Sequence, residues 1–232
     1  MTTRVYLIRH GATQLSSEDR FSGATDVDLS EEGRLQAEHL AKRLAGDKIS
    51  AFYCSPMIRT VETAQIIARP HGMVPVQVDS LREINHGHWE KMLRGDVEVQ
   101  FPEEYAAWQT DPFTFAPEGG ESGLSVMARA LPAIREIVVK HKDENVAVIS
   151  HKATIRLVIS SLLGFDARGY RDRLDQSPAC LNILDFKDPV CARLTLFNDV
   201  SHYIDQPPYP RRHLSKWWDA QTTDGIDGES KR

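Results

Sequence analysis

The stretch Val5-Tyr6-Leu7-Ile8-Arg9-His10-Gly11 decides the fold of this chain. Its four apolar or β-favouring residues run directly into an arginine, a histidine and a glycine, which predicts a buried strand with a cation and an imidazole at its end. Open α/β sheets bind their ligands at the carboxyl ends of their strands. A histidine at a strand end is also commonly a hydrogen-bonded loop residue, so this stretch alone leaves both roles open.

The same arrangement occurs twice more along the chain. Residues 51–54 are an apolar run followed by Ser55-Pro56, a pair that favours helix entry, and Arg59 falls in the first turn of the predicted helix. Residues 146–150 form a third apolar run, which ends on His151. In a parallel sheet these three ends meet at one edge. A cation beside a helix N-terminus is unfavourable unless an anion lies between them, which indicates a phosphate or carboxylate ligand.

The composition limits the class of protein. Of the 232 residues, 41% are hydrophobic and 26% are charged, which is typical of a folded globular protein, and we predict a single domain over residues 1–206. The formal charge of −5 argues against a nucleic-acid partner, because proteins that bind the phosphate backbone usually carry a basic face. No apolar run reaches the roughly 18 residues of a membrane span, so no membrane partner is expected.

The cysteines and the first residues bear on the compartment. Cys54, Cys180 and Cys191 are odd in number and widely spaced, which indicates neither a disulfide framework nor a zinc site and favours a reducing environment. The first predicted strand begins almost directly after Met1, which leaves no room for a leader peptide. We therefore expect a cytoplasmic protein, and a mature organellar form stays open.

Residues 12–29 are polar and without periodicity, which predicts a long loop at the edge where the strands end. Arg20 in this loop either reaches a phosphate or is a solvated arginine. Ser30 then has the features of a helix N-cap, with two glutamates following it.

A short strand is predicted over residues 74–78, and an irregular loop that carries Glu83 follows it over 81–90. His86 and His88 in this loop resemble a metal pair, but no third ligand stands at a recognisable spacing. We therefore predict no metal.

Residues 95–118 are rich in aromatic residues and proline and predict an insertion with a short helix near 103–110. Two interpretations stay open. The insertion is either a cap that excludes water and sets the size of the substrate, or a satellite hydrophobic cluster under a long loop.

The remaining elements follow from periodicity. A helix opens at Ser122, and Pro132 should kink or interrupt it. A buried helix over 153–163 follows the third strand, and two antiparallel strands, 181–186 and 192–197, form an edge hairpin. Residues 207–232 are predicted to be a partly disordered tail, anchored by Trp217-Trp218.

Five motifs together resemble the histidine phosphatase superfamily, in its phosphoglycerate-mutase-like branch. They appear in the expected order and span about residues 4–200: Arg9-His10-Gly11, Ser55 with Arg59 and Thr63-Ala64, Leu81-Arg82-Glu83, Gly119-Gly120-Glu121-Ser122, and Ser150-His151. The resemblance implies a three-layer α/β/α sandwich with a mostly parallel sheet and an antiparallel edge. It also implies a metal-independent reaction through a phosphohistidine, with no cofactor.

The resemblance assigns a role to each matching residue. His10 attacks phosphorus, since a neutral imidazole is a competent nucleophile at pH 7. Arg9, Arg59 and His151 surround the phosphoryl oxygens, and Glu83 protonates the leaving alkoxide and then activates water. The predicted substrate- and phosphate-binding residues are Arg9, Arg20, Ser22, Gly23, Arg59, Arg82, His151 and Lys152.

Some positions depart from the family pattern. Ala12 and Ser16 stand where an acid and an asparagine are often found, which leaves the loop contacts to phosphate open. Lys152 and Lys91 each replace a glycine, and Lys152 either adds a cation to the pocket or points away from it.

The functional prediction is a phosphatase for small phosphomonoesters, such as phosphorylated acids or sugars. A cofactor-dependent phosphoglycerate mutase is the alternative, but mutases resemble one another in a longer and more basic insertion, whereas residues 95–118 contain no Lys or Arg. A regulatory protein that binds phosphate esters without turnover is the second alternative. A homodimer through the edge hairpin or the tail is also open.

Overall fold

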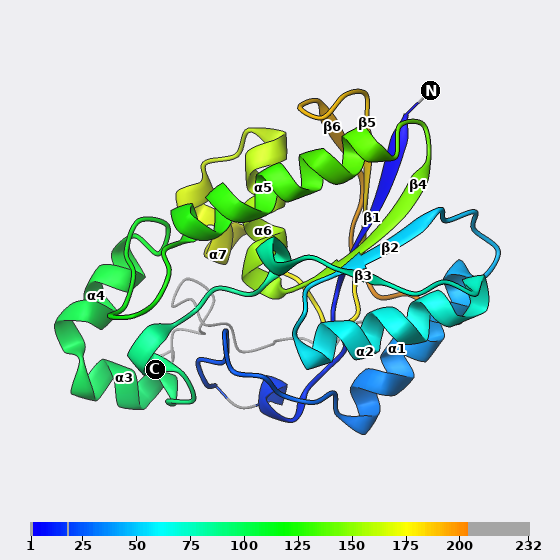
Figure 1. Ribbon diagram of the computed structural model, residues 1–232. Coiled ribbons are helices and arrows are strands. Elements are labelled where there is room, and N and C mark those ends of the chain that lie inside the picture. The colour runs from blue at the N-terminus through cyan, green and yellow to red at the C-terminus, as the bar shows by residue number, and fades with distance from the viewer. Residues whose placement is uncertain (1, 18, 204–232) are drawn as a thin grey trace, which may run out of the picture.

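The computed structural model describes residues 2–17 and 19–203 and contains a six-stranded sheet (Figure 1). The strands lie in the order β3-β2-β4-β1-β5-β6. The first four are parallel, β5 is antiparallel to β1, and β6 is antiparallel to β5. Their bounds are β1 Thr3–Arg9, β2 Ala51–Cys54, β3 Val76–Gln77, β4 Asn145–Ser150, β5 Leu181–Phe186 and β6 Ala192–Asp199. The mostly parallel sheet with an antiparallel edge hairpin is confirmed.

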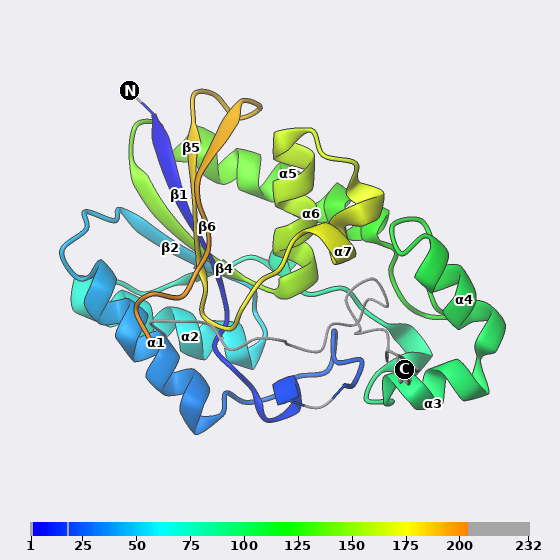
Figure 2. The same ribbon diagram turned by 180° about the vertical axis from the view of Figure 1, so that it is seen from behind.

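Helices cover both faces of the sheet, as Figures 1 and 2 show. Helices α1 (Glu31–Leu44) and α2 (Ile58–Ala68) pack against one face, and α5 (Gly123–Lys140) and α6 (Lys152–Leu163) pack against the other. Side chains alternate between the two faces along β1. Tyr6 packs in the hydrophobic cluster under α1 and α2, while Val5 and Leu7 pack in the cluster under α5 and α6. The three-layer α/β/α prediction is confirmed.

The helix ends test the predicted caps. The Ser30 hydroxyl accepts a hydrogen bond from the Gly33 amide at 3.1 Å, which confirms this N-cap. The predicted cap at Ser55 is wrong. Helix α2 begins at Ile58 and its N-cap is Met57. The Ser55 hydroxyl accepts a 3.4 Å hydrogen bond from the Met57 amide and lies 2.8 Å from Nε2 of His151.

Of the two outcomes predicted at Pro132, interruption is wrong, because α5 continues through it from Gly123 to Lys140, and a kink stays a prediction. Pro132 and Ala128, whose carbonyl loses its partner, are both exposed, so water can solvate that carbonyl. The opposite face of α5 is buried against α6 and the sheet, and this packing outweighs the lost hydrogen bond.

The aromatic insertion holds two helices, α3 (Arg94–Gln100) and α4 (Pro102–Thr110). The second confirms the predicted short helix, and the first was not predicted. Both stand apart from the sheet in Figures 1 and 2. Their aromatic residues form a separate buried cluster with Phe21 and Trp89.

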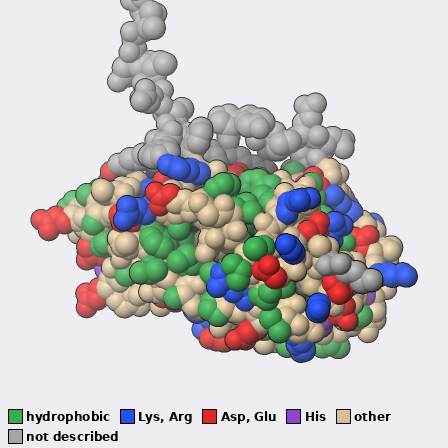
Figure 3. Space-filling view, turned by 90° about the horizontal axis from the view of Figure 1, so that it is seen from above, with side chains coloured by type: hydrophobic (Ala, Val, Ile, Leu, Met, Phe, Trp, Pro, Cys, Tyr) green, Lys and Arg blue, Asp and Glu red, His purple; other side chains and the backbone are tan. Residues whose placement is uncertain are grey.

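Short segments complete the chain. Helix α7 covers Tyr170–Arg173, and five 3-10 turns lie at Gln14–Ser17, Arg69–His71, Asp79–Leu81, Gly87–Trp89 and Ala167–Gly169. The predicted tail, with Trp217-Trp218, lies outside the described residues. Within those residues, no helix is both long and apolar enough to cross a membrane. Figure 3 shows acidic and basic side chains interspersed on one face, without a continuous basic surface among the residues described there.

Candidate active site

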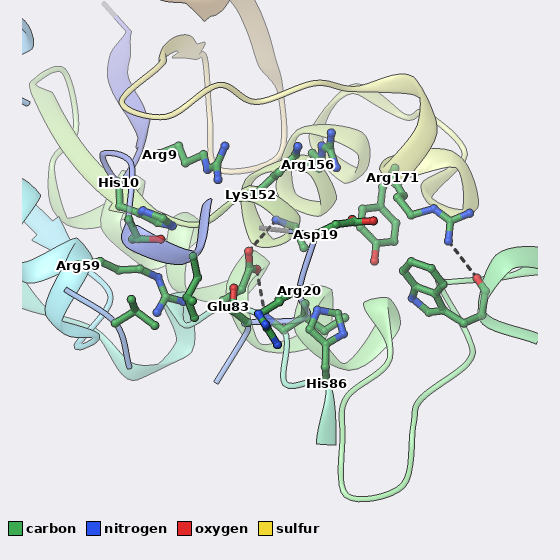
Figure 4. Close-up of a pocket in the computed structure, with 18 residues that line it drawn as sticks. Arg9, His10, Asp19, Arg20, Arg59, Glu83, His86, Lys152, Arg156 and Arg171 are labelled. Atoms are coloured by element: carbon green, nitrogen blue, oxygen red, sulfur yellow. Dashed lines mark hydrogen bonds between the residues drawn. The ribbon is translucent and has the colours of Figure 1, made fainter. Parts of the chain in front are cut away.

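A pocket of about 280 Å³ lies where β1, β2 and β4 end (Figure 4). The first strand ends at Arg9 and leads into His10, β4 is followed by Lys152, and Arg59 lies five residues after the end of β2. All four line the pocket, as expected for the carboxyl edge of a parallel sheet. The lining residues are Arg9, His10, Thr13, Leu15, Asp19, Arg20, Ser22, Val27, Arg59, Glu83, Ile84, His86, Trp108, Lys152, Ala153, Arg156, Tyr170 and Arg171.

His10 follows β1 and is buried, with 6% of its surface exposed. Its ring Nδ1 lies 2.7 Å from the Gly11 carbonyl oxygen, and only a protonated Nδ1 can donate this hydrogen bond. The lone pair is therefore on Nε2. Burial lowers the pKa of His10 well below 6.5, and the positive charges of Arg59 and Arg9 lower it further. His10 is thus a neutral imidazole of fixed tautomer at pH 7, as a nucleophile must be.

The loop after His10 is pressed onto the start of α1. A methyl group on Gly33 would collide with the backbone of Ala12, and one on Gly11 would collide with the backbone of Gly33. Only glycine allows the two backbones to approach this closely. The Gly11 amide also donates to the Thr63 hydroxyl at 3.2 Å, so α1 and α2 both fix the position of His10.

Arg59, which is buried, and Arg9, which is partly buried, bring two positive charges to the same pocket. Arg9 donates from Nη1 to the Gln176 carbonyl at 2.6 Å, while its buried Nε has no partner among the described residues. Arg59 donates to the Thr25 and Gly23 carbonyls, both at 2.8 Å. Neither guanidinium forms an ion pair within the described part of the chain. Burial lowers the pKa of both groups, and the charge of Glu83 in the same pocket offsets this only in part.

His151 is fully buried next to His10 and is not among the residues that line the pocket. Its ring centroid is 5.2 Å from that of His10, and its Nε2 lies 2.8 Å from the Ser55 hydroxyl oxygen. Its Nδ1 is buried with no partner in residues 2–17 and 19–203. Burial lowers the pKa of His151 well below 6.5, and the charges of Arg59 and Arg9 contribute. If the Ser55 hydroxyl donates to Nε2, then Nδ1–H is a free donor for an oxyanion.

Glu83 places a carboxylate in the pocket, at the N-terminus of α6. It accepts hydrogen bonds from the amides of Ala153 at 3.0 Å, Thr154 at 3.2 Å and Ile84 at 3.0 Å. Two of these are helix N-terminal amides, which stabilise an anion. Arg129 fixes the loop from outside, because its guanidinium donates to the Glu83 carbonyl at 3.0 Å and to two further carbonyls of the same loop. The position suits proton transfer to and from a substrate.

The remaining predicted binding residues divide into two groups. Arg20 and Ser22 line the pocket. Gly23 does not line it and instead supplies one of the carbonyls that hold the nearby guanidinium. Arg82 does not line it either, since its half-exposed side chain pairs with Asp79 at 2.7 Å. Lys152 points into the pocket and not away from it.

Sequence analysis missed several lining residues, among them Arg156, Tyr170, Arg171 and Trp108. One signal was available for Arg156, since it is the only charged residue within the apolar run 153–163. Trp108 comes from α4, so the insertion both forms its own buried cluster and reaches the pocket. The two alternatives considered for residues 95–118 are therefore not exclusive.

The two histidines of the loop 81–90, His86 and His88, contact different residues. His86 packs on Phe21, while His88 lies 3.3 Å from the Glu104 carboxylate. No group of three or more His, Cys, Asp or Glu residues suited to hold a metal ion occurs in the described ranges.

Comparisons with known proteins agree with this geometry. A sequence model of the histidine phosphatase superfamily (branch 1) matches residues 5–200. Phosphoserine phosphatase 1 of Hydrogenobacter thermophilus is 34% identical over 163 residues, which cover 70% of this chain and 77% of that protein. Phosphoglycerate mutase-like protein 4 of Arabidopsis thaliana is 36% identical over 201 residues, which cover 85% and 86%.

Among solved structures, native mycobacterial glucosyl-3-phosphoglycerate phosphatase is similar with a TM-score of 0.77 at 27% identity. The match covers 85% of this chain and 99% of that one.

Proposed function

The chain belongs to branch 1 of the histidine phosphatase superfamily, and on this premise we propose that it hydrolyses small phosphomonoesters through a phosphohistidine at His10. The observation that carries the proposal is the neutral Nε2 of His10 in a pocket with two arginines, Arg9 and Arg59, that form no ion pair with the described residues. This arrangement supplies a nucleophile together with the positive charge that phosphoryl transfer requires.

In the first step, Nε2 of His10 forms a bond to phosphorus while the phosphorus–oxygen ester bond breaks. Glu83, in its protonated form, gives its proton to the leaving oxygen, and the alcohol departs. The Glu83 carboxylate then accepts a proton from a water molecule, whose oxygen attacks the phosphohistidine. Inorganic phosphate leaves, and both side chains return to their starting states.

Three donors stabilise the charge on the phosphoryl oxygens in both steps. Arg9 contributes the unpaired Nε, Arg59 a guanidinium fixed by two carbonyls, and His151 the unpaired Nδ1. Because their positions are fixed before substrate arrives, little reorganisation is needed during the reaction. No step requires a metal or a cofactor.

Hydrolysis is favoured over phosphoryl transfer between carbon positions. The insertion that reaches the pocket is acidic and has no Lys or Arg over residues 95–118, so it offers no second phosphate site to a bisphosphate. Two relatives have the word phosphatase in their names, one for phosphoserine and one for glucosyl-3-phosphoglycerate. Both names denote phosphate esters of small acids, which supports a substrate of this class.

The test is phosphate release from a panel of small phosphomonoesters with excess EDTA. We expect release that survives chelation and is lost in His10→Ala, whereas His39→Ala, a change on α1 outside the pocket, leaves it intact. Interconversion of 2- and 3-phosphoglycerate without net phosphate release would identify a mutase. Binding of phosphate esters with neither reaction would identify the regulatory protein.

A further inference from the structure

Two cations lie one helical turn apart on α6, next to the reacting groups. Lys152 directly follows His151, and Arg156 stands four residues further on, so both side chains face the same side of the helix. Both line the pocket. Figure 4 shows them together, beside Arg9 and on the same side of the pocket.

These two cations share one carboxylate. Asp175 Oδ1 lies 3.5 Å from the Lys152 Nζ and 3.3 Å from an Arg156 terminal nitrogen. Two positive charges therefore meet one negative charge. The pair is already arranged to hold a carboxylate oxygen between them, and the site retains one positive charge in excess.

Arg156 also has unused hydrogen-bonding capacity. Its side chain is only 7% exposed, and its Nε is buried with no partner within residues 2–17 and 19–203. A buried donor without a partner is unfavourable, and a bound acceptor relieves this. Arg171, which also lines the pocket, is by contrast occupied by Asp172 and by two backbone carbonyls.

The charge balance of the whole pocket points the same way. Six Lys or Arg side chains line it, but only two carboxylates do so among the described residues. Arg9 and Arg59 account for the phosphoryl group. Burial, together with the charges of Arg156 and Arg9, lowers the pKa of Lys152 to about 7, because the single carboxylate of Asp175 does not offset these effects.

We propose that Lys152 and Arg156 bind a carboxylate that the substrate carries in addition to its phosphate. The substrate class is then the phosphate ester of a small hydroxy acid, which is a size that a pocket of about 280 Å³ accepts. A second phosphate would bring more negative charge than the single excess positive charge balances. This assignment rests on the proposed phosphatase activity and adds the specificity of its pocket.

The experiment compares matched substrates with and without the carboxylate. The pairs are 3-phosphoglycerate with glycerol 3-phosphate, and phosphoserine with phosphoethanolamine. The readout is the ratio of the two kcat/KM values within each pair. We expect the wild-type enzyme to prefer the acid by about ten-fold or more, and Lys152→Met to lower the ratio by about ten-fold, as is typical when a charge-assisted hydrogen bond is lost. Lys187→Met, on the β5–β6 turn, should keep the wild-type ratio.

The pH dependence separates charge from shape. The wild-type ratio should fall as pH rises through 7, because Lys152 loses its proton there, and Lys152→Arg should keep the ratio high to pH 9. The charged groups that act on Lys152 are Arg156, Arg9 and Asp175. The pKa values of His10 and His151 lie below 6.5. Their protonation, like that of the ester phosphate, affects both substrates of the 3-phosphoglycerate pair equally and therefore cancels in the ratio.

The outcomes distinguish the two proposals. If the wild-type enzyme hydrolyses neither member of either pair nor any other phosphomonoester, the proposed function fails. If it hydrolyses both members and the ratio is unchanged in Lys152→Met and in Arg156→Lys, the carboxylate site is wrong and the phosphatase activity stands. A ratio that falls in both variants supports the assignment.

Discussion

Replacement of Glu90 by glutamine should loosen the loop that holds Arg59. The Glu90 carboxylate accepts five hydrogen bonds that tie residues 23–25 to the loop of Glu83. The donors are the amides of Gly23, Ala24, Thr25 and His86 and the hydroxyl of Thr25, at 2.7–3.1 Å. The carbonyls of this same loop fix the Arg59 guanidinium.

The magnitude follows from the hydrogen-bond count. Glutamine keeps one acceptor oxygen and presents an NH₂ group in place of the other, so the Thr25 amide at 3.1 Å faces a donor and loses its bond. The remaining bonds lose their charge assistance. A hydrogen bond to a charged group contributes about 1.5–3 kcal/mol, so the free energy of unfolding should fall by about 3 kcal/mol. For a chain of this length that corresponds to a fall in Tm of about 6–12 °C.

Thermal unfolding followed by circular dichroism, with kcat/KM on a reactive aryl phosphate, measures both effects. We expect kcat/KM to fall about ten-fold or more, because Arg59 no longer has a fixed position. Burial raises the pKa of Glu90, but hydrogen bonds from Thr25, His86 and Ala24 outweigh it, and the net pKa is below 4.5. The stabilisation is therefore complete above pH 4.5 and is lost as pH falls through the lowered pKa.

The difference in Tm between the wild type and Glu90→Gln should thus be largest near neutral pH and shrink in acid. Glu136→Gln, at an exposed position of α5, is the matched control and should change neither Tm nor activity. Equal Tm and equal kcat/KM in the wild type and Glu90→Gln at pH 7 would refute this account of the loop.

Three further predictions concern the residues around the nucleophile. Gly33→Ala should lower kcat/KM by about ten-fold, as its methyl group displaces Ala12 and the adjoining nucleophile, and an unchanged rate in a folded variant would contradict the close approach. Ser55→Ala should lower kcat about two- to ten-fold, because it removes one hydrogen bond to His151. Titration of the His151 ring by NMR should show that its environment has changed. The kcat/KM profile should fall in acid when His10 of the free enzyme is protonated. The midpoint of this fall should lie below pH 6.5, since burial and two arginines lower the pKa of His10. A midpoint above pH 6.5 would contradict the neutral nucleophile.

The sheet and the positions of most candidate catalytic residues could be predicted because their signals are local. Strands β1 and β4 are buried on both faces and therefore appear as uninterrupted apolar runs. The polar residue that ends each run marks the carboxyl edge. Since parallel strands share that edge, Arg9, His10, Arg59 and His151 could be brought together without knowledge of any contact.

Most features that the sequence did not reveal depend on contacts between distant parts of the chain, whereas Arg82 is diverted by Asp79, only three residues away. A serine before proline has the local features of a helix cap, but Ser55 bonds to His151, which is 96 residues away. The geometry of Lys152 and Arg156 depends on Asp175, which the apolar pattern of α6 does not reveal. Continuation of α5 through Pro132 depends likewise on which side of the helix faces solvent. These contacts can be identified only once the folded structure is known.

The unbalanced positive charge of the pocket has two linked consequences. Arg9 and Arg59 are the proposed partners of the phosphoryl group. Burial lowers the pKa of His10, and the charges of Arg59 and Arg9 lower it further. The imidazole therefore meets the substrate in its neutral form, with its lone pair available. The arriving phosphate then offsets the charge of the arginines, and the pKa of a nearby imidazole rises accordingly. The positive charge proposed to recognise the substrate thus adds to the effect of burial, and both keep the proposed nucleophile unprotonated before the substrate binds.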